Sequence, residues 1–348
     1  MAYTTIKKPS DYFNTKIYTG NGSTQSISSV GFQPDLTWLK VRLAGSGQDH
    51  TWYDSVRGAT KFIESNTTNA EATGSNYLTS FDSDGFTLGN DQSHVNASGD
   101  SYASWNWLGA NGTASNTDGS ITSTVSANTT SGFSIVSYTG NGTGNSTIGH
   151  GLGATPKFII VKNRTTAQQW GTYSPSFVSA SEPRILYLSN TASYANDTNV
   201  WGTSASFNNN TFTVGDWNGS NQSGSNFIAY CFADVKGFSK FGNYTGNGST
   251  DGTFVYTGFK PAWLLIKGTN VAASWRMVDN KRNTFNVMDK KLSPPSANAE
   301  STETICDFLS NGFKMKSTDA AINGSGNNFI YMAFAEEPLV GDNPCTAR

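Results

Sequence analysis

The sequence predicts an all-β protein built from three tandem β-sandwich domains of the jelly-roll or lectin-like kind, related by an internal repeat. Three observations predict this fold class. Four sequence markers occur in the same order three times along the 348 residues. The marker strands alternate apolar and polar residues, as half-buried strands do. Turns rich in Gly, Asn and Ser separate the short strands, a pattern typical of sandwiches and barrels.

The first marker is the phrase YTGNG, which occurs at 18–22, 138–142 and 244–248. It lacks the Lys-Ser/Thr of a phosphate-binding P-loop and does not match the dinucleotide fingerprint G-x-G-x-x-G. Asn-Gly is a preferred pair for tight hairpin turns, because both residues tolerate positive φ. We therefore expect the first hairpin turn of each repeat at Asn21-Gly22, Asn141-Gly142 and Asn247-Gly248.

The second marker is an apolar strand that a proline precedes and a lysine ends. The lysine lies six positions after the proline in every copy, giving the pairs Pro34 and Lys40, Pro156 and Lys162, and Pro261 and Lys267. Strands that are apolar on both faces are typical of the centre of a sheet. A segment that contains tryptophan follows each of these strands.

The third and fourth markers are an alternating strand after a Gly/Asn turn, and an aromatic closing strand. The alternating strands span 84–89, 210–215 and 311–316, and the closing strands span 102–107, 227–232 and 329–334. One face of each closing strand is bulky, as with Ala103, Trp105 and Trp107 in the first copy. Such a face is expected to pack against a second sheet.

These markers divide the chain into repeats with connecting segments. The stretch at 111–130 has low hydrophobicity and is interpreted as a linker or an extended hairpin. The expected organisation is an N-terminal arm (1–15), repeat 1 (16–110), the linker or hairpin (111–130), repeat 2 (131–236), repeat 3 (237–338) and a C-terminal tail (339–348).

The composition argues against several function classes. Net charge is −2 and charged residues make up 14% of the chain, so no basic surface for nucleic acid is indicated. No apolar run approaches the ~20 residues of a membrane helix, and the N-terminus lacks the apolar segment of a signal peptide. We expect no cofactor and no metal, because the acidic loop FDSDGF (81–86) lacks the further ligands of a calcium loop and reads as a turn.

Catalytic motifs are also missing from the sequence. Three histidines lie in loops rich in Gly, Ser and Asn, and no serine elbow or HExxH zinc motif occurs. Asp54 and Glu64 could form the carboxylate pair of a glycosidase, but the other two copies do not repeat them. We expect the protein not to be an enzyme.

The tryptophan-bearing segments supply the candidate ligand-binding residues. Exposed aromatic rings could stack on sugar faces while neighbouring polar groups bind hydroxyls; the alternative is that one tryptophan per repeat belongs to the core. The candidates are His50, Trp52, Tyr53, Asp54, Arg57, Trp170, Tyr173 and Trp275.

The motifs GFQPDLTWLKVR, TWYDSVRGATKFIESNTTNAEA, LTSFDSDGFTLGND and SYASWNW, with the ending YMAFAEEPLVGDNPCTAR, carry a family resemblance. Together they resemble an uncharacterised repeat-domain family of marine bacteriophage virion proteins, often called tail-fibre or lectin-like. The resemblance is specific in residues 31–107 and weaker in the later copies. It implies a phage particle component with sandwich domains, and it supplies no catalytic or ligand residues.

Two roles are consistent with this resemblance. The first is a tail-associated, receptor-binding protein that attaches the phage to a host-cell glycan. The alternative is a capsid decoration protein or another structural protein of the particle surface. In either role we expect a virion location after synthesis in the host cytoplasm. The expected partners are other virion proteins, a host glycan and further copies of the chain, without nucleic acid or membrane insertion.

Overall fold

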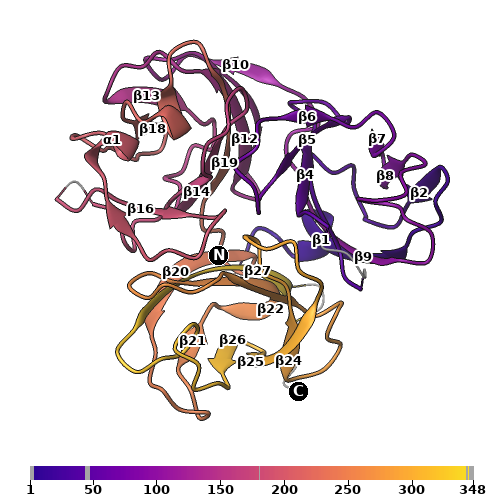
Figure 1. Cartoon of the computed structure of the whole chain (residues 1–348). Helices are drawn as coiled ribbons and strands as arrows, with labels where there is room; N and C mark the ends of the chain where they lie inside the picture. Colours follow the sequence, from indigo (N-terminus) through magenta and orange to yellow (C-terminus); the bar gives the residue numbers. More distant parts are fainter. Residues whose placement is uncertain (1–3, 44–47, 180, 342–343, 345–348) are drawn as a thin grey trace.

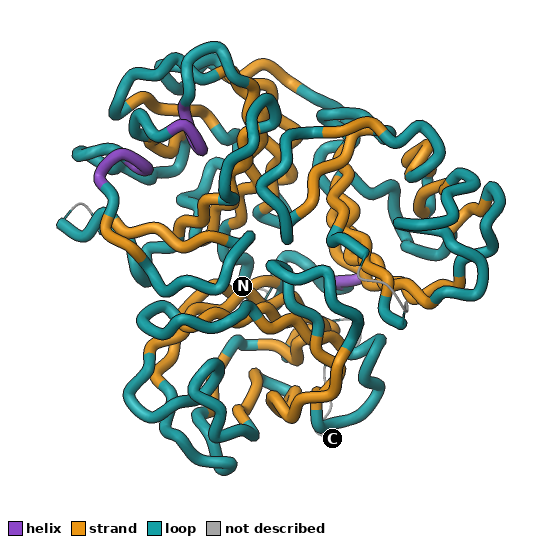
Figure 2. Tube along the Cα trace, viewed as in Figure 1, coloured by secondary structure: helices purple, strands orange, loops and turns teal. Residues whose placement is uncertain are grey.

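The computed structural model describes residues 4–43, 48–179, 181–341 and 344. The chain is all-β, and its sheets are antiparallel apart from one isolated parallel bridge. Figure 2 shows strands and loops throughout, with short helices at η1 (Pro9–Asp11), α1 (Thr198–Trp201) and α2 (Asn218–Asn221). The prediction of an all-β sandwich fold is confirmed.

Each repeat contributes an inner sheet, which lies toward the centre of the molecule, and an outer sheet. In repeat 1 the inner sheet has the order β1 (Phe13–Thr19), β9 (Ser101–Trp107), β3 (Leu36–Val41), β4 (Thr51–Asp54), β5 (Lys61–Glu64) and β6 (Ala72–Thr73). Its outer sheet has the order β2 (Gln25–Ile27), β8 (Gly85–Leu88) and β7 (Leu78–Asp82).

Repeat 2 follows the same plan with extra strands at both edges. Its inner sheet has the order β10 (Ala114–Asn116), β11 (Ser123–Asn128), β12 (Phe133–Thr139), β19 (Asn226–Phe232), β14 (Phe158–Asn163), β15 (Gly171–Tyr173), β16 (Arg184–Tyr187) and β17 (Ala195–Asn196). Its outer sheet pairs β13 (Ser146–Gly149) with β18 (Thr211–Val214).

Repeat 3 has two sheets of four strands each. The inner order is β20 (Ser239–Thr245), β27 (Asn328–Pro338), β22 (Phe259–Gly268) and β23 (Arg276–Asp279). The outer order is β21 (Phe254–Tyr256), β26 (Gly312–Met315), β25 (Ser301–Leu309) and β24 (Met288–Lys291). In all three repeats the closing strand lies between the opening strand and the post-proline strand, so the repeats share one topology.

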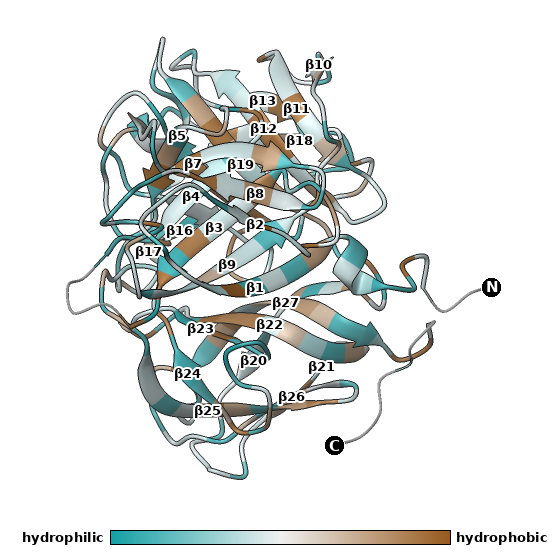
Figure 3. Ribbon diagram, turned by 90° about the vertical axis from the view of Figure 1, so that its right-hand side faces the viewer, coloured by the Kyte–Doolittle hydropathy of each residue, from teal (hydrophilic) through white to brown (hydrophobic). Residues whose placement is uncertain are grey.

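A common core joins the three repeats, which form three lobes around one centre (Figure 1). In Figure 3 much of the hydrophobic colour lies on the strands. The bulky face of each closing strand points into this common core, so it packs against the inner sheets of other repeats and not against the outer sheet of its own. The core contains equivalent residues of each repeat, namely Trp38, Trp105, Ile160, Tyr230, Leu265 and Met332.

The YTGNG phrases form three equivalent turns, but they are not hairpins. The strand before each turn pairs within the inner sheet and the strand after it pairs within the outer sheet, so the turn carries the chain between sheets. A buried asparagine before the closing strand holds each turn, and its carbonyl accepts a hydrogen bond from the turn glycine, whose φ is positive. The pairs are Gly22 and Asn96 (2.7 Å), Gly142 and Asn221 (2.8 Å), and Gly248 and Asn323 (2.7 Å).

The segments outside the repeats are also placed. Of the two interpretations of the segment at 111–130, the structure shows the extended hairpin. β10 pairs with β11, and β11 pairs in turn with β12 in the sheet of repeat 2. Part of the predicted N-terminal arm packs on the body: Ile6 is buried, Tyr12 contacts Phe238, and β1 already begins at Phe13. Most of the tail at 339–348 lies outside the described residues.

Candidate functional site

All eight residues proposed from the sequence for ligand binding are buried, at 8% exposure or less. An aromatic ring must be exposed to stack on a sugar, so the expectation of an exposed aromatic surface here is wrong and the core-packing alternative holds. The buried residues are His50, Trp52, Tyr53, Asp54, Arg57, Trp170, Tyr173 and Trp275.

Most of these side chains lie where one repeat meets the next. The indole Nε1 of Trp170, in repeat 2, donates to the carbonyl of Glu64 in repeat 1 at 3.0 Å. In the same way Trp275, in repeat 3, donates to the carbonyl of Tyr187 in repeat 2 at 2.9 Å. His50 occupies the equivalent position in repeat 1. In each repeat the strand-ending lysine donates to a backbone carbonyl, and this residue comes two positions after that carbonyl.

The strand-ending lysines form a cyclic set of bridges between repeats. Each buried ammonium donates to a carbonyl in its own repeat and to a second carbonyl in a neighbouring repeat. The bridges run from repeat 1 to 3, from 2 to 1 and from 3 to 2, which gives the body an approximate threefold arrangement. The pairs are Lys40 with Ala297 (2.8 Å), Lys162 with Thr68 (2.9 Å) and Lys267 with Thr191 (3.1 Å).

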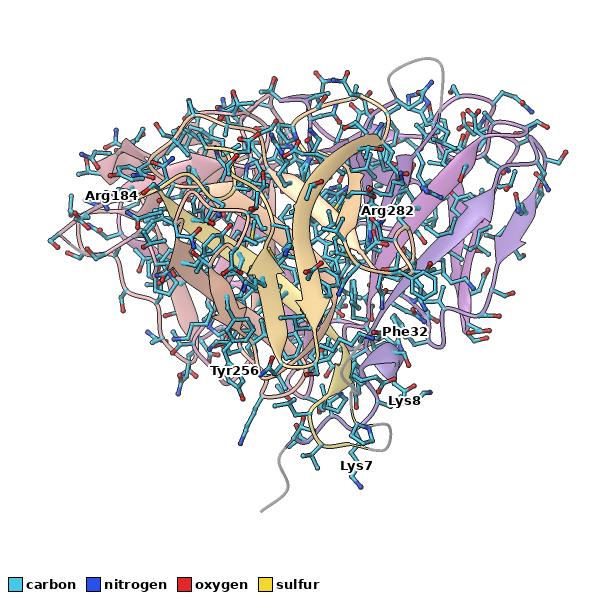
Figure 4. The ribbon with its side chains drawn as sticks, turned by 90° about the horizontal axis from the view of Figure 1, so that it is seen from below. Lys7, Lys8, Phe32, Arg184, Tyr256 and Arg282 are labelled. Carbon is cyan, nitrogen blue, oxygen red and sulfur yellow. The ribbon has the colours of Figure 1, made fainter. Side chains whose placement is uncertain are left out.

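Within the described residues, buried ion pairs occupy two of the three junctions. Between repeats 1 and 2, Asp54 pairs with Arg57 and accepts a hydrogen bond from the hydroxyl of Tyr230 at 2.7 Å. Between repeats 3 and 1, Asp279 pairs with Arg282 and accepts from the indole of Trp105 at 3.1 Å. Figure 4 shows Arg282 between the ribbons of these repeats. Because all these groups are buried and paired, their role is structural.

The carboxylates considered for glycoside hydrolysis do not face each other. Glu64 lies opposite Thr51 in the register of β4 and β5, and Asp54 is three residues after Thr51. Since successive residues of a strand point to opposite faces, Asp54 faces the junction with repeat 2 and Glu64 faces the interior of the repeat 1 sandwich. The two groups therefore do not flank a common cleft.

Among the described residues, the most exposed aromatic side chains on strands belong to β21 in repeat 3. Phe254 is 45% exposed and Tyr256 is 57% exposed, whereas Val255 between them is buried. The two rings share one face of the strand and lie about 7 Å apart along it. Because β21 is the edge strand of its sheet, one side of this pair is open. Figure 4 places Tyr256 at the rim of the molecule.

Polar groups surround these rings. Lys314 is the cross-strand neighbour of Phe254 and pairs with Asp251. Tyr256 lines an open hollow of about 550 Å³, together with Lys240 and Asp234, whose ammonium and carboxylate are 2.5 Å apart. An exposed aromatic wall beside charged hydrogen-bonding groups can bind a polar ligand that also has an apolar face.

The sequence does contain a signal for this surface. In each repeat, the strand after the YTGNG turn has a buried residue that pairs with the alternating strand. This residue is Ile27 in repeat 1, Ile148 in repeat 2 and Val255 in repeat 3. The outward residues on either side of it are small or polar in the first two repeats and aromatic only in the third. These outward pairs are Ser26 and Ser28, Thr147 and Gly149, and Phe254 and Tyr256.

The whole body, from the 3-10 helix to the last strand, corresponds to one known family. A family model described as a domain of unknown function (DUF7483) matches residues 8–338. The chain belongs to this family. The DUF7483 match spans the three repeats, which agrees with their shared core. No curated protein and no solved structure matches the DUF7483 chain. Over its described residues, this DUF7483 protein forms no helix of the length and hydrophobicity that a membrane crossing needs.

Proposed function

We propose that this DUF7483 protein is a non-enzymatic bacteriophage virion protein that attaches the particle to a glycan of the host cell. The virion assignment rests on the sequence resemblance. The attachment role rests on one structural observation, the exposed pair Phe254 and Tyr256 on the open edge strand β21. Single exposed apolar side chains are common, but large ones that lie side by side on a surface are typical of binding sites.

A glycan fits this surface better than a purely apolar ligand. A sugar ring has an apolar face of C–H groups that can lie on an aromatic ring, and hydroxyls at its edge that need hydrogen-bond partners. The Lys240–Asp234 pair in the adjoining hollow supplies both a donor and an acceptor. Two rings about 7 Å apart could contact neighbouring sugar units of a polysaccharide chain.

Binding to surface polysaccharides tests the proposal. Lipopolysaccharide and capsular polysaccharide from a panel of marine bacteria are immobilised, and binding of the full chain is measured by biolayer interferometry. The test variant Phe254→Ser with Tyr256→Ser introduces the residues that repeat 1 has at the equivalent positions. Phe285→Ser, which removes an aromatic side chain that is 74% exposed but lies outside β21, is the matched control.

The expected result is saturable binding to at least one polysaccharide, retained by the control and reduced at least about tenfold by the double variant, a loss of about 1.4 kcal/mol or more. Equal binding by the folded double variant and the wild type would remove β21 as the attachment surface. No binding across the panel would count against attachment to this class of glycan.

The approximate threefold arrangement favours a second candidate role, capsid decoration. A body that presents three similar units around one axis can contact three equivalent subunits of a particle surface. This role predicts many copies of the chain spread over the phage head.

A further inference from the structure

Repeat 1 contains a group of potential metal ligands at one end of its sandwich. Asp49 lies before β4, Glu64 is the last residue of β5, and His94 lies in the loop between β8 and β9. One ligand atom from each of these three residues lies within 4.8 Å of the other two. Residues from three separate segments therefore converge on one point.

Buried hydroxyls without partners border this group. The side chain of Thr51 shares a face with Glu64, because the two residues are cross-strand neighbours. Tyr53 lies two residues further on the same face, and burial, with smaller contributions from the charges of Asp91 and Glu64, raises the pKa of its hydroxyl. The Thr51 hydroxyl lies near enough to that of Tyr53 to oppose this rise in pKa. Among the described residues, neither hydroxyl has a hydrogen-bond partner of good geometry, although both residues are fully buried. A bound water or ion beside the cluster would complete the hydrogen bonding of these hydroxyls.

The charge of the cluster also favours a cation. Burial first, and then the neighbouring charge of Asp49, raises the pKa of Glu64 to about 7. The charge of Asp49 also acts on the ammonium of Lys40, but that ammonium donates its hydrogen bonds to the carbonyls of Gln48 and Ala297. Two neighbouring carboxylates repel each other, and an ion bound between them relieves this repulsion.

The loop that carries His94 is held in place by its own contacts. The carboxylate of Asp91 accepts hydrogen bonds from the backbone N–H groups of His94 and of Val95, the latter at 2.7 Å. The imidazole ring stacks on Tyr77 with a centroid separation of 4.7 Å, and 25% of the side chain remains exposed. The imidazole is therefore oriented by neighbours and is still reachable from solvent.

The repeats show that the imidazole of His94 is not needed for the fold. His94 lies two positions before the turn-holding Asn96, and the same position is Gly219 in repeat 2 and Ala321 in repeat 3. The shared topology therefore forms without an imidazole there. A specific role for repeat 1 explains the cluster better than a common structural role.

We propose that Asp49, Glu64 and His94 bind one divalent transition-metal cation at the end of the repeat 1 sandwich. Imidazole nitrogen with carboxylate oxygens is a ligand set that suits Zn²⁺ and Mn²⁺. The Thr51 side chain lies on the same face of the sheet as Glu64, where its hydroxyl could hold a metal-bound water. The site lies in a different repeat from β21, so it is independent of the proposed glycan surface.

Calorimetric titration of the full chain with ZnCl₂ and MnCl₂, after removal of metals with EDTA, tests this site. His94→Ala removes a ligand, and Glu64→Gln keeps the shape of the second ligand while removing its charge. Asp100→Asn makes the same charge change in repeat 1 outside the cluster. Near-ultraviolet circular dichroism and the thermal midpoint of each variant show that it is folded.

The proposal predicts one equivalent of bound metal per chain, with a rise in thermal midpoint on metal addition. His94→Ala and Glu64→Gln should each weaken binding by at least about tenfold, whereas Asp100→Asn should bind as the wild type does. Absence of saturable binding of either metal would overturn the proposal. The closeness of Asp49 and Glu64 would then be explained by a proton shared between their carboxylates. Wild-type affinity in His94→Ala would also overturn it. If Glu64→Gln does not fold, the His94→Ala result decides.

Discussion

The ammonium group of Lys162 in repeat 2 donates a hydrogen bond to the main-chain carbonyl of Thr68 in repeat 1, at 2.9 Å. It also donates to the carbonyl of Gln168 in its own repeat, at 2.8 Å. Lys40 and Lys267 make the corresponding contacts at the other two junctions. A lysine at this strand position therefore joins the repeats.

Replacing Lys162 by methionine should destabilise the protein. The variant Lys162→Met removes both hydrogen bonds that the buried ammonium donates. The carbonyl of Gln168 loses this donor, whereas that of Thr68 keeps the backbone N–H of Gln168. An unsatisfied buried polar group costs about 1–3 kcal/mol. We expect the free energy of unfolding, measured by urea denaturation, to fall by about 2 kcal/mol. Lys157→Met, one residue before β14 and only half-buried, is the control and should change stability by less than about 0.5 kcal/mol. Equal stability of the two variants would show that the bridge contributes nothing.

The cost of Lys162→Met should increase with pH. Burial lowers the pKa of Lys162 to about 7, from the value of 10.5 in an unfolded chain. Between pH 7 and 10.5, Lys162 is protonated in the unfolded chain but largely neutral in the folded protein. Because the unfolded chain then binds more protons, the free energy of unfolding of the wild type increases relative to that of the variant as pH rises from 7 toward 9. The difference should grow by up to about 1.4 kcal/mol per pH unit. A cost that is constant over this range in urea denaturation would show that Lys162 keeps an ordinary pKa.

Tyr230→Phe should destabilise the junction between repeats 1 and 2. The variant removes the 2.7 Å hydrogen bond to the buried carboxylate of Asp54 while keeping the ring. Hydrogen bonds to charged groups contribute about 1.5–3 kcal/mol, so we expect a loss in that range. Tyr256→Phe removes an exposed hydroxyl and should leave stability unchanged in the same denaturation measurement. A loss for Tyr256→Phe as large as for Tyr230→Phe would contradict this account of the junction.

The three turn-holding asparagines should be energetically equivalent. Each buried amide donates to carbonyls of its turn and of the loop before the closing strand; for Asn221 these are Thr143 and Gly215, both at 2.9 Å. Alanine at 96, 221 or 323 should each lower the free energy of unfolding by about 2–3 kcal/mol. Asn76→Ala, at an exposed position, serves as the reference for an asparagine that does not hold a YTGNG turn. A cost near zero at one of the three sites would show that the turns are not equivalent.

The order of strands could be predicted from the sequence because each strand carries its own alternation of apolar and polar residues. The partner of a buried face could not be predicted in the same way. The bulky face of β9, with Trp105 and Trp107, is recognisable as buried, but local pattern does not say whether its own outer sheet or another repeat covers it. The structure shows that the other repeats do.

The same limit explains the outcome for the candidate site. Trp170 and Trp275 look like exposed binding residues in a polar loop, but they donate hydrogen bonds across the junctions, which only the packing of the repeats reveals. Phe254 and Tyr256 could have been found by aligning the outward positions of the three repeats. The convergence of Asp49, Glu64 and His94 depends on three distant segments and could not have been predicted from spacing.

The position of the chain in the phage particle tests the central claim most directly. Particles of a phage that encodes this chain are imaged by cryo-electron microscopy, with a gold-labelled antibody against the purified chain as marker. An attachment protein predicts label and matching three-lobed density at the tail, in the few copies that a tail carries. Label spread over the head would contradict attachment and support decoration, and particles without label would contradict the virion assignment.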